Sequence, residues 1–284
     1  YYQSIGLGVS VGPQPLLPYI EGEGEITFFK ELDGEPVSHR FVTGGAHSFK
    51  DGQSQIGNCQ LEVYPMRPGP GMFISRYLET KGDGINHIAF NTTDIERDTQ
   101  FFLDRGCDLV FNVTTNGKTV ENYIDTRLHG DLMISLRPPA DTWEKSWRKN
   151  NESHPLVNKW KFLGLGICVN DLESASGYYS KLGYKRTEEK KVRKECKITS
   201  EEFYVSNVLF ELIQAEKDSI YKNSLAQRGD GVAEMIFQVS DMKTELDLLK
   251  NKGAKILKVS DDKKTAYIDS CMKGNLLTRL MEID

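Results

Sequence analysis

The strongest constraint on the fold of this chain is an internal repeat. Residues 82–95 read GDGINHIAFNTTDI, and residues 229–242 read GDGVAEMIFQVSDM, aligned without a gap at an offset of 147 (229 − 82). In both copies the apolar first part is typical of a strand, and an aspartate then stands where a helix N-cap belongs. The glycine that ends the predicted helix recurs at the same offset, as Gly106 and Gly253. The chain is therefore expected to contain at least two copies of a unit in which a strand is followed by a capped helix.

A second kind of unit also repeats. Residues 1–7 read YYQSIGL and residues 178–184 read YYSKLGY, at an offset of 177 (178 − 1). The two kinds of unit alternate along the chain, so the sequence predicts a duplicated pair. Within the units, turn signals such as Asn116-Gly117 separate strand-like runs. Each unit is therefore expected to be a strand, a helix and three strands.

These units predict an α+β fold of four βαβββ modules. One unit cannot bury both faces of its curved sheet, whereas two units side by side form an open barrel with a cleft between them. We therefore expect two open barrel-like domains, at residues 1–139 and 159–284, with a linker at 140–158. The strand that should precede the helix end at residues 1–5 is expected to be missing from the first domain. Residues 31–55 are expected to be a long loop or hairpin insertion.

Composition limits the classes of function. The net charge of −5 gives no electrostatic case for nucleic acid, and the basic run at residues 185–197 is interleaved with glutamate, as in a solvated edge. No apolar run approaches the roughly 18 residues of a membrane span. The five cysteines show no CxxC pairing, which suits buried thiols in a reducing compartment. We expect a cytoplasmic protein with a small-molecule ligand and no nucleic-acid or membrane partner, and a homodimer is one option for its assembly.

The motifs of these units resemble those of the vicinal oxygen chelate superfamily. They are His-Ile-Ala-Phe at residues 87–90 followed by Asp94-Ile95, Tyr-Tyr before Leu-Gly at 178–183, and Leu-Phe-Glu-Leu at 209–212. That superfamily contains glyoxalase I, bleomycin resistance proteins, extradiol dioxygenases and methylmalonyl-CoA epimerase. The resemblance implies the glyoxalase fold over nearly the whole chain, with the first domain most similar to the epimerase and glyoxalase I.

The resemblance also implies a divalent metal ion (Mn, Co, Mg, Zn or Fe) in each cleft. Its ligands would come from the first and last strands of both modules. In the first domain these positions carry Glu62 and His87, while the first histidine would lie on the missing strand. Ser135 stands where the family has a glutamate, and we assign it to substrate binding. Glu25 is similar to the other catalytic carboxylate of the family.

The second domain is expected to have lost its metal. The four matching positions are Gly164, Glu211, Glu234 and Arg279, without a histidine. A guanidinium at a ligand position would repel a cation, so a buried ion pair of Glu211 or Glu234 with Arg279 is the alternative. The His-His-Glu set of extradiol dioxygenases is also absent from this domain.

Three hypotheses on function follow. The first is a metal-assisted isomerase or lyase acting on a small oxygen-rich acid, ketone or thioester, in which the metal stabilises an enolate and Glu25 moves a proton. The second is a non-catalytic protein that binds or sequesters a small molecule, as bleomycin resistance proteins do. The third is a catalytically empty scaffold. Glu62 with His87 favours the first hypothesis, whereas Ser135 and the second domain favour the others. A strand histidine such as His87 can also be a hydrogen-bonded structural residue.

Overall fold

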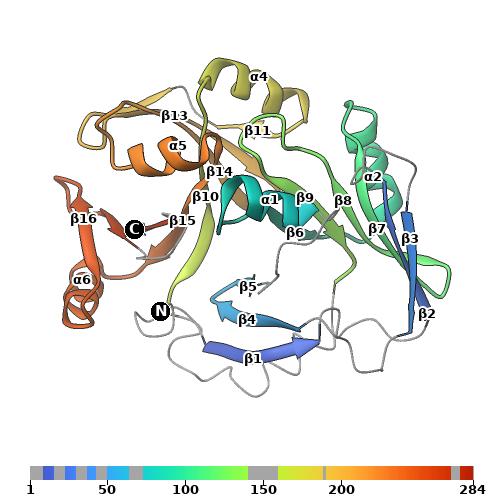
Figure 1. Ribbon diagram of the computed structural model, residues 1–284. Coiled ribbons are helices and arrows are strands. Elements are labelled where there is room, and N and C mark those ends of the chain that lie inside the picture. Colours follow the sequence, from blue (N-terminus) through green and yellow to red (C-terminus); the bar gives the residue numbers. More distant parts are fainter. Residues whose placement is uncertain are drawn as a thin grey trace.

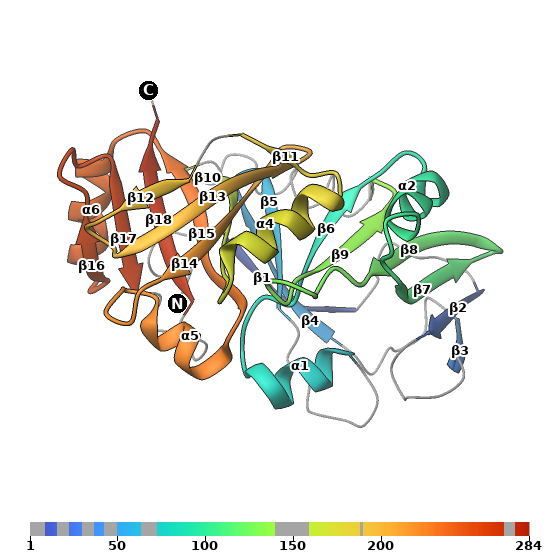
Figure 2. The same cartoon turned by 90° about the horizontal axis from the view of Figure 1, so that it is seen from above.

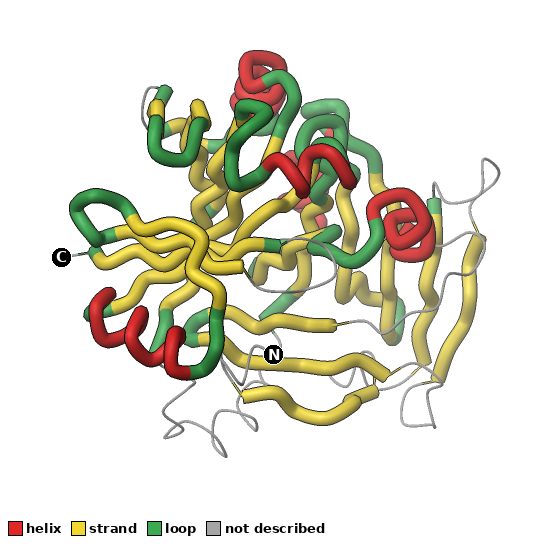
Figure 3. The backbone as a smooth tube through the Cα atoms, turned by 60° about the vertical axis from the view of Figure 1, so that its left-hand side comes forward, coloured by secondary structure: helices red, strands yellow, loops and turns green. Residues whose placement is uncertain are grey.

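The computed structural model (Figure 1) describes residues 9–15, 23–29, 37–42, 50–63, 73–139, 159–187, 190–269 and 276–283. We call the described residues up to 139 the N-terminal half and those from 159 onward the C-terminal half. Strands dominate both halves, and the helices lie at the outside of the sheets (Figure 3). None of the described helices is long and apolar enough to cross a membrane. The helix end predicted at residues 1–5 and the linker predicted at 140–158 lie outside the described residues.

The C-terminal half contains a nine-stranded sheet. Its strands are β10 (Lys161–Cys168), β11 (Lys185–Arg186), β12 (Lys191–Arg193), β13 (Ile198–Val205), β14 (Val208–Ala215), β15 (Gly231–Val239), β16 (Lys255–Val259), β17 (Thr265–Asp269) and β18 (Leu277–Glu282). Their order is β11-β13-β14-β10-β15-β18-β17-β16, with β12 also paired to β13. The antiparallel pair of β10 and β15 at the centre joins two modules into one sheet.

Three helices accompany this sheet, α4 (Leu172–Lys181), α5 (Lys222–Arg228) and α6 (Met242–Asn251). The α4 and α6 helices follow β10 and β15, so the predicted order of strand, helix and further strands is confirmed in both modules of this half. The α5 helix lies in the polar segment between β14 and β15, for which no helix was predicted. It has no side-chain cap at its N-terminus, and a helix of one to two turns leaves little periodic signal in the sequence.

The N-terminal half contains a six-stranded sheet and a three-stranded sheet. The six-stranded sheet has the order β3-β2-β7-β8-β9-β6, and the three-stranded sheet has the order β1-β4-β5. The strands are β1 (Val9–Pro15), β2 (Glu23–Phe28), β3 (Val37–Val42), β4 (Lys50–Ile56), β5 (Cys59–Val63), β6 (His87–Asn91), β7 (Leu109–Thr115), β8 (Lys118–Ile124) and β9 (Met133–Arg137). The helices are α1 (Phe73–Lys81) and α2 (Ile95–Leu103). The run from β6 through α2 to β9 confirms the predicted second module.

The predicted first module differs from the structure. The segment at residues 31–55, expected as a loop or hairpin insertion, contributes β3 and β4. The hairpin of β2 and β3 adds to the outer edge of β7, while β4 and β5 belong to the other sheet. The module is therefore divided between two sheets. The position of these polar strands depends on which distant strand each one pairs with, and the local sequence does not determine that pairing.

The N-caps predicted at Asp94 and Asp241 are confirmed, and Asp171 caps α4 in the same way. The Asp94, Asp171 and Asp241 carboxylates accept hydrogen bonds from the backbone N–H groups of Arg97, Ser174 and Thr244. Each cap satisfies a backbone donor that the first helical turn leaves without a partner. These caps fix where each strand ends and each helix begins.

The two halves share one hydrophobic core. Ile134 and Leu136 of the six-stranded sheet belong to the same buried cluster as Trp160, Phe210 and many other residues of the C-terminal half. The six- and nine-stranded sheets lie side by side, with α4 near their junction (Figure 2). One face of the six-stranded sheet therefore packs against the C-terminal half.

Candidate functional site

The opposite face of the six-stranded sheet carries a row of polar side chains. Strand register places His87 beside Met133, and Ser135 between Ala89 and Tyr123. Residues that pair across strands point to the same side of a sheet, and so do residues two apart on one strand. We call this surface the His87 face and define it by His87, Ala89, Glu121, Tyr123, Met133, Ser135 and Arg137.

His87 is held by a hydrogen bond at each ring nitrogen. Its Nδ1 lies 2.7 Å from Asn86 Oδ1, and its Nε2 lies 3.2 Å from the Tyr123 hydroxyl. Because the amide oxygen is an acceptor, this arrangement places the ring proton on Nδ1 and leaves the Nε2 lone pair to accept from Tyr123. Burial and the positive charge of Arg137 lower the pKa of His87 from 6.5 to about 4. The imidazole is therefore neutral at pH 7.

This low pKa predicts a loss of stability in acid. Between pH 6.5 and about 4 the unfolded chain binds a proton at His87 that the folded chain does not, so the free energy of unfolding falls as pH falls. A full shift corresponds to about 3 kcal/mol, and we expect about 1–2 kcal/mol because the ring is partly exposed. Urea unfolding of the wild type and of His87→Gln across this pH range measures the difference. Parallel pH curves for the two proteins would contradict the assignment.

The same face also carries a buried carboxylate, that of Glu121. The Ser135 hydroxyl donates a 2.7 Å hydrogen bond to Glu121 Oε1, and both side chains are buried. The predicted substrate-binding residue Ser135 is therefore engaged by a residue that sequence reasoning missed. The sequence did contain a signal for Glu121. Positions 121 and 123 are two apart on the strand predicted opposite Ser135, so their side chains are expected on the same side of the sheet.

Arg137 supplies the positive charge of this cluster. Its charge lowers the pKa of His87 and opposes burial at Cys59, whose thiol pKa burial raises to about 12. Cys59 belongs to β5, so the charge of Arg137 acts toward both the six-stranded and the three-stranded sheet. The same field that disfavours a proton on His87 also disfavours a metal cation at its Nε2.

The other predicted site residues lie on different strands. Glu62 is partly buried on β5, in the three-stranded sheet, whereas His87 is on β6 of the six-stranded sheet. Glu25 is on β2, and β7, β8 and β9 lie between it and His87. Four strand spacings correspond to about 19 Å along the sheet. Strand register places Ser135 near His87, whereas the predicted roles of Glu62 and Glu25 at the same site stay predictions.

These positions do not complete a metal site within the described ranges. No group of three or more His, Cys, Asp or Glu side chains that could hold a metal ion is found among the described residues. A divalent cation needs about three or four N, O or S donors, and Ser135 occupies the position where the family resemblance implies a glutamate. The donor set around His87 fits hydrogen bonding to an organic oxygen better than it fits a metal.

The equivalent region of the C-terminal half is filled by an ion network. The Arg279 guanidinium pairs with Glu211 and lies 3.1 Å from Glu234 Oε1, so both predicted ion pairs are present. Arg193 pairs with the other side of Glu211, and Tyr221 donates a 2.7 Å hydrogen bond to Glu234. Two guanidinium groups thus balance two carboxylates in a buried position.

Electrostatics keep this network charged. Burial opposes the charge of Arg279, but Glu234 and the phenol groups of Tyr221 and Tyr267 raise the pKa of its guanidinium above the ordinary value. Arg193 corrects the expectation of a wholly solvated edge at residues 185–197, because its side chain turns inward to Glu211. The centre of this region is thus held by a guanidinium, and the predicted loss of a metal from this half stays a prediction.

Comparisons with known proteins agree with this architecture. A family model described as "Glyoxalase/Bleomycin resistance protein/Dioxygenase superfamily" matches residues 165–270. Among solved structures, a triple mutant of 4-hydroxymandelate synthase from Streptomyces coelicolor is 14% identical with a TM-score of 0.62, and the match covers 92% of this chain and 84% of that one. Methylmalonyl-CoA epimerase from Mycobacterium tuberculosis is 21% identical with a TM-score of 0.39, over 44% of this chain and 88% of that one.

A search of curated proteins found no match. The likeness to the synthase extends over both halves and shows a shared fold. The family model covers both modules of the nine-stranded sheet from β10 to β17. The chain therefore contains a domain of the glyoxalase/bleomycin resistance protein/dioxygenase superfamily, as its motifs predicted.

Proposed function

We propose that the His87 face binds a small organic acid or a similar oxygen-rich molecule. The observation that carries this proposal is the neutral His87, held between Asn86 and Tyr123 on a face that retains exposed surface at Ala89. Polar groups that converge on a partly open sheet face are typical of a small-molecule site. The corresponding region of the C-terminal half is occupied by its own ion network, so this face is the better candidate of the two.

The polar residues of the face, together with Asn86 beside it, would take different parts in binding. Asn86 fixes the ring orientation and the proton on Nδ1, so Nε2 and the Tyr123 hydroxyl form one donor and acceptor pair. A ligand would replace the hydrogen bond between them: a ligand hydroxyl would then donate to Nε2, and a carbonyl or carboxylate oxygen would accept from the Tyr123 hydroxyl. The positive charge of Arg137 favours ligands with negative charge on the oxygen. The hydrogen bond between Ser135 and Glu121 stabilises the strands next to Tyr123.

Calorimetric titration with a panel of small carboxylic acids tests this proposal. Removing only the hydroxyl, in Tyr123→Phe, is expected to weaken binding of the best acid by about tenfold, because one hydrogen bond to a charged oxygen is lost. His87→Ala is expected to abolish it. Tyr204→Phe is the matched control, because Tyr204 lies exposed on β13 of the other half. Unchanged affinity in both Tyr123→Phe and His87→Ala would overturn the proposal.

A second candidate is the metal-assisted isomerase or lyase predicted from the sequence. The arrangement of Asn86 and His87 favours it, since metal-binding histidines usually donate one ring N–H to an oxygen and present the other nitrogen. Elemental analysis of protein from cultures supplemented with manganese, cobalt or zinc tests this candidate. Near-stoichiometric metal that is lost in His87→Ala would support it, and metal-free protein would eliminate it.

A further inference from the structure

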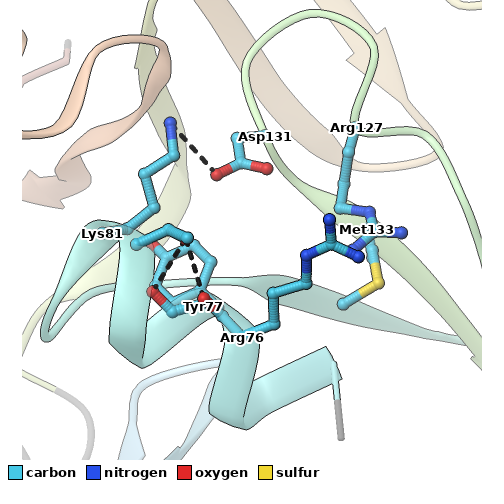
Figure 4. A pocket seen from close by; sticks show the side chains of 7 residues that line it. Arg76, Tyr77, Lys81, Arg127, Asp131 and Met133 are labelled. Atoms are coloured by element: carbon cyan, nitrogen blue, oxygen red, sulfur yellow. Dashed lines mark hydrogen bonds and ion pairs between the residues drawn. The ribbon is translucent and has the colours of Figure 1, made fainter. Parts of the chain in front are cut away.

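A small pocket opens between α1 and the turn that joins β8 to β9 (Figure 4). Its volume is about 110 Å³, and its lining includes Arg76, Tyr77, Lys81, Arg127, Asp131 and Met133. Since a water molecule occupies about 30 Å³ of liquid, the pocket holds one carboxylate or phosphate group with a few waters. It is too small for a nucleotide.

The pocket has more positive than negative charge. Lys81 pairs with Asp131 at 3.4 Å, and its ammonium group also donates to the backbone oxygens of Arg228 and Asp230. Arg127 forms two parallel hydrogen bonds, of 2.9 and 2.8 Å, with the Asp125 carboxylate. Lys81 and Arg127 thus neutralise the Asp131 and Asp125 carboxylates, and the positive charge of Arg76 remains in excess.

Arg76 is the cation available to a ligand. Its side chain is exposed, extends from α1 toward Arg127 and Met133 (Figure 4), and its guanidinium makes no hydrogen bond or ion pair with any described residue. Arg228 also lies close enough to act on the Asp131 carboxylate. This local excess of positive charge occurs in a chain with a net charge of −5, so general surface charge does not explain it.

The pocket borders the His87 face. Met133, part of its lining, is the cross-strand partner of His87 and packs against Tyr123 in one small cluster. Neighbouring strands are separated by about 4.8 Å, so the lining residue Met133 and His87 are one strand spacing apart.

We infer that the pocket binds an anionic oxygen group, a carboxylate or a phosphate, of the ligand whose other end lies at His87. The fork of an arginine side chain matches two oxygens of either group. This inference rests on the proposed function and deepens it, because it requires the ligand to carry an anionic group at a fixed distance from the part held by His87 and Tyr123.

Calorimetry with inorganic phosphate and with malonate tests the inference on the intact protein. Arg76→Gln is expected to weaken the tighter of the two probes by at least about tenfold. Arg76 is exposed, so this variant is expected to fold normally, which its unfolding curve checks. The matched control is Arg97→Gln, which removes an exposed arginine of α2 outside the pocket and is expected to bind like the wild type. Tighter phosphate binding would identify a phosphate group, and tighter malonate binding a carboxylate.

The outcomes separate this inference from the proposed function. If Arg76→Gln binds both probes like the wild type, or if the wild type binds neither at tens of millimolar, the pocket assignment is wrong. If Arg76→Gln weakens phosphate while His87→Ala and Tyr123→Phe leave every organic acid unaffected, the pocket assignment stands and the proposed function fails.

Discussion

Replacing Arg279 by methionine is expected to lower the free energy of unfolding by about 3–5 kcal/mol. Arg279 is 1% exposed and lies between Glu211 and Glu234, which are equally buried. Its removal leaves two carboxylates with one guanidinium, that of Arg193, in a position that water does not reach. Urea unfolding followed by circular dichroism measures the change.

The double variant Arg279→Met with Glu234→Met is the informative control. It leaves the charge-balanced pair of Arg193 and Glu211 and is expected to recover part of the lost stability, because a whole ion pair can be replaced by apolar groups more readily than half of one. Lys197→Met, which breaks the exposed pair with Asp218, is expected to leave the unfolding midpoint unchanged. A small effect of Arg279→Met would show that the network is not desolvated as described.

Replacing Gly164 by alanine is expected to destabilise the chain by about 3 kcal/mol or more. A Cβ at this position would lie 1.9 Å from the backbone oxygen of Leu209 and 2.6 Å from its carbonyl carbon. Gly164 sits on β10, between β14 and β15, so neither neighbouring backbone can move without loss of sheet pairing. The unfolding midpoint in urea measures the effect.

Gly177→Ala is the matched control for this substitution. Gly177 lies within α4, and an added Cβ there meets no atom within 4 Å. Because alanine is the better helix former, we expect a gain of up to about 1 kcal/mol. Equal effects at Gly164 and Gly177 would contradict the packing described for β10. The same crowding explains why a histidine cannot simply be restored at position 164 to rebuild a metal site in this half.

The local parts of the fold were predictable because their signals are local. The aspartate caps and the Asn116-Gly117 turn, with φ of 50° and 71°, follow from what single residues do to the backbone. The repeat then extended the prediction from one module to the others. The α1 and α5 helices were missed, since no aspartate stands directly before either of them in the sequence, as one does before α2, α4 and α6.

The candidate site was predictable only in part. His87 and Ser135 were identified from the resemblance and do lie on one face. Glu121, Tyr123 and Arg137 were missed because their contacts depend on strand register, which a single sequence does not fix in advance. The prediction for Arg193 was wrong for a similar reason. The alternating charges of residues 185–197 are typical of a solvent-exposed edge, and only the fold shows that Arg193 pairs with the buried Glu211. The predicted partnership of Glu62 with His87 is not tested by these contacts and stays a prediction.

The central claim is that His87 is a neutral, oriented imidazole on the ligand-binding face of the six-stranded sheet. Nitrogen-15 NMR of histidine-labelled protein, assigned with His87→Gln, tests it most directly. We expect the His87 ring to keep its proton on Nδ1, to stay neutral down to about pH 5, and to shift at Nε2 when the best acid of the panel is added. A ring that titrates near its ordinary pKa of 6.5 and does not respond to any acid would contradict the claim.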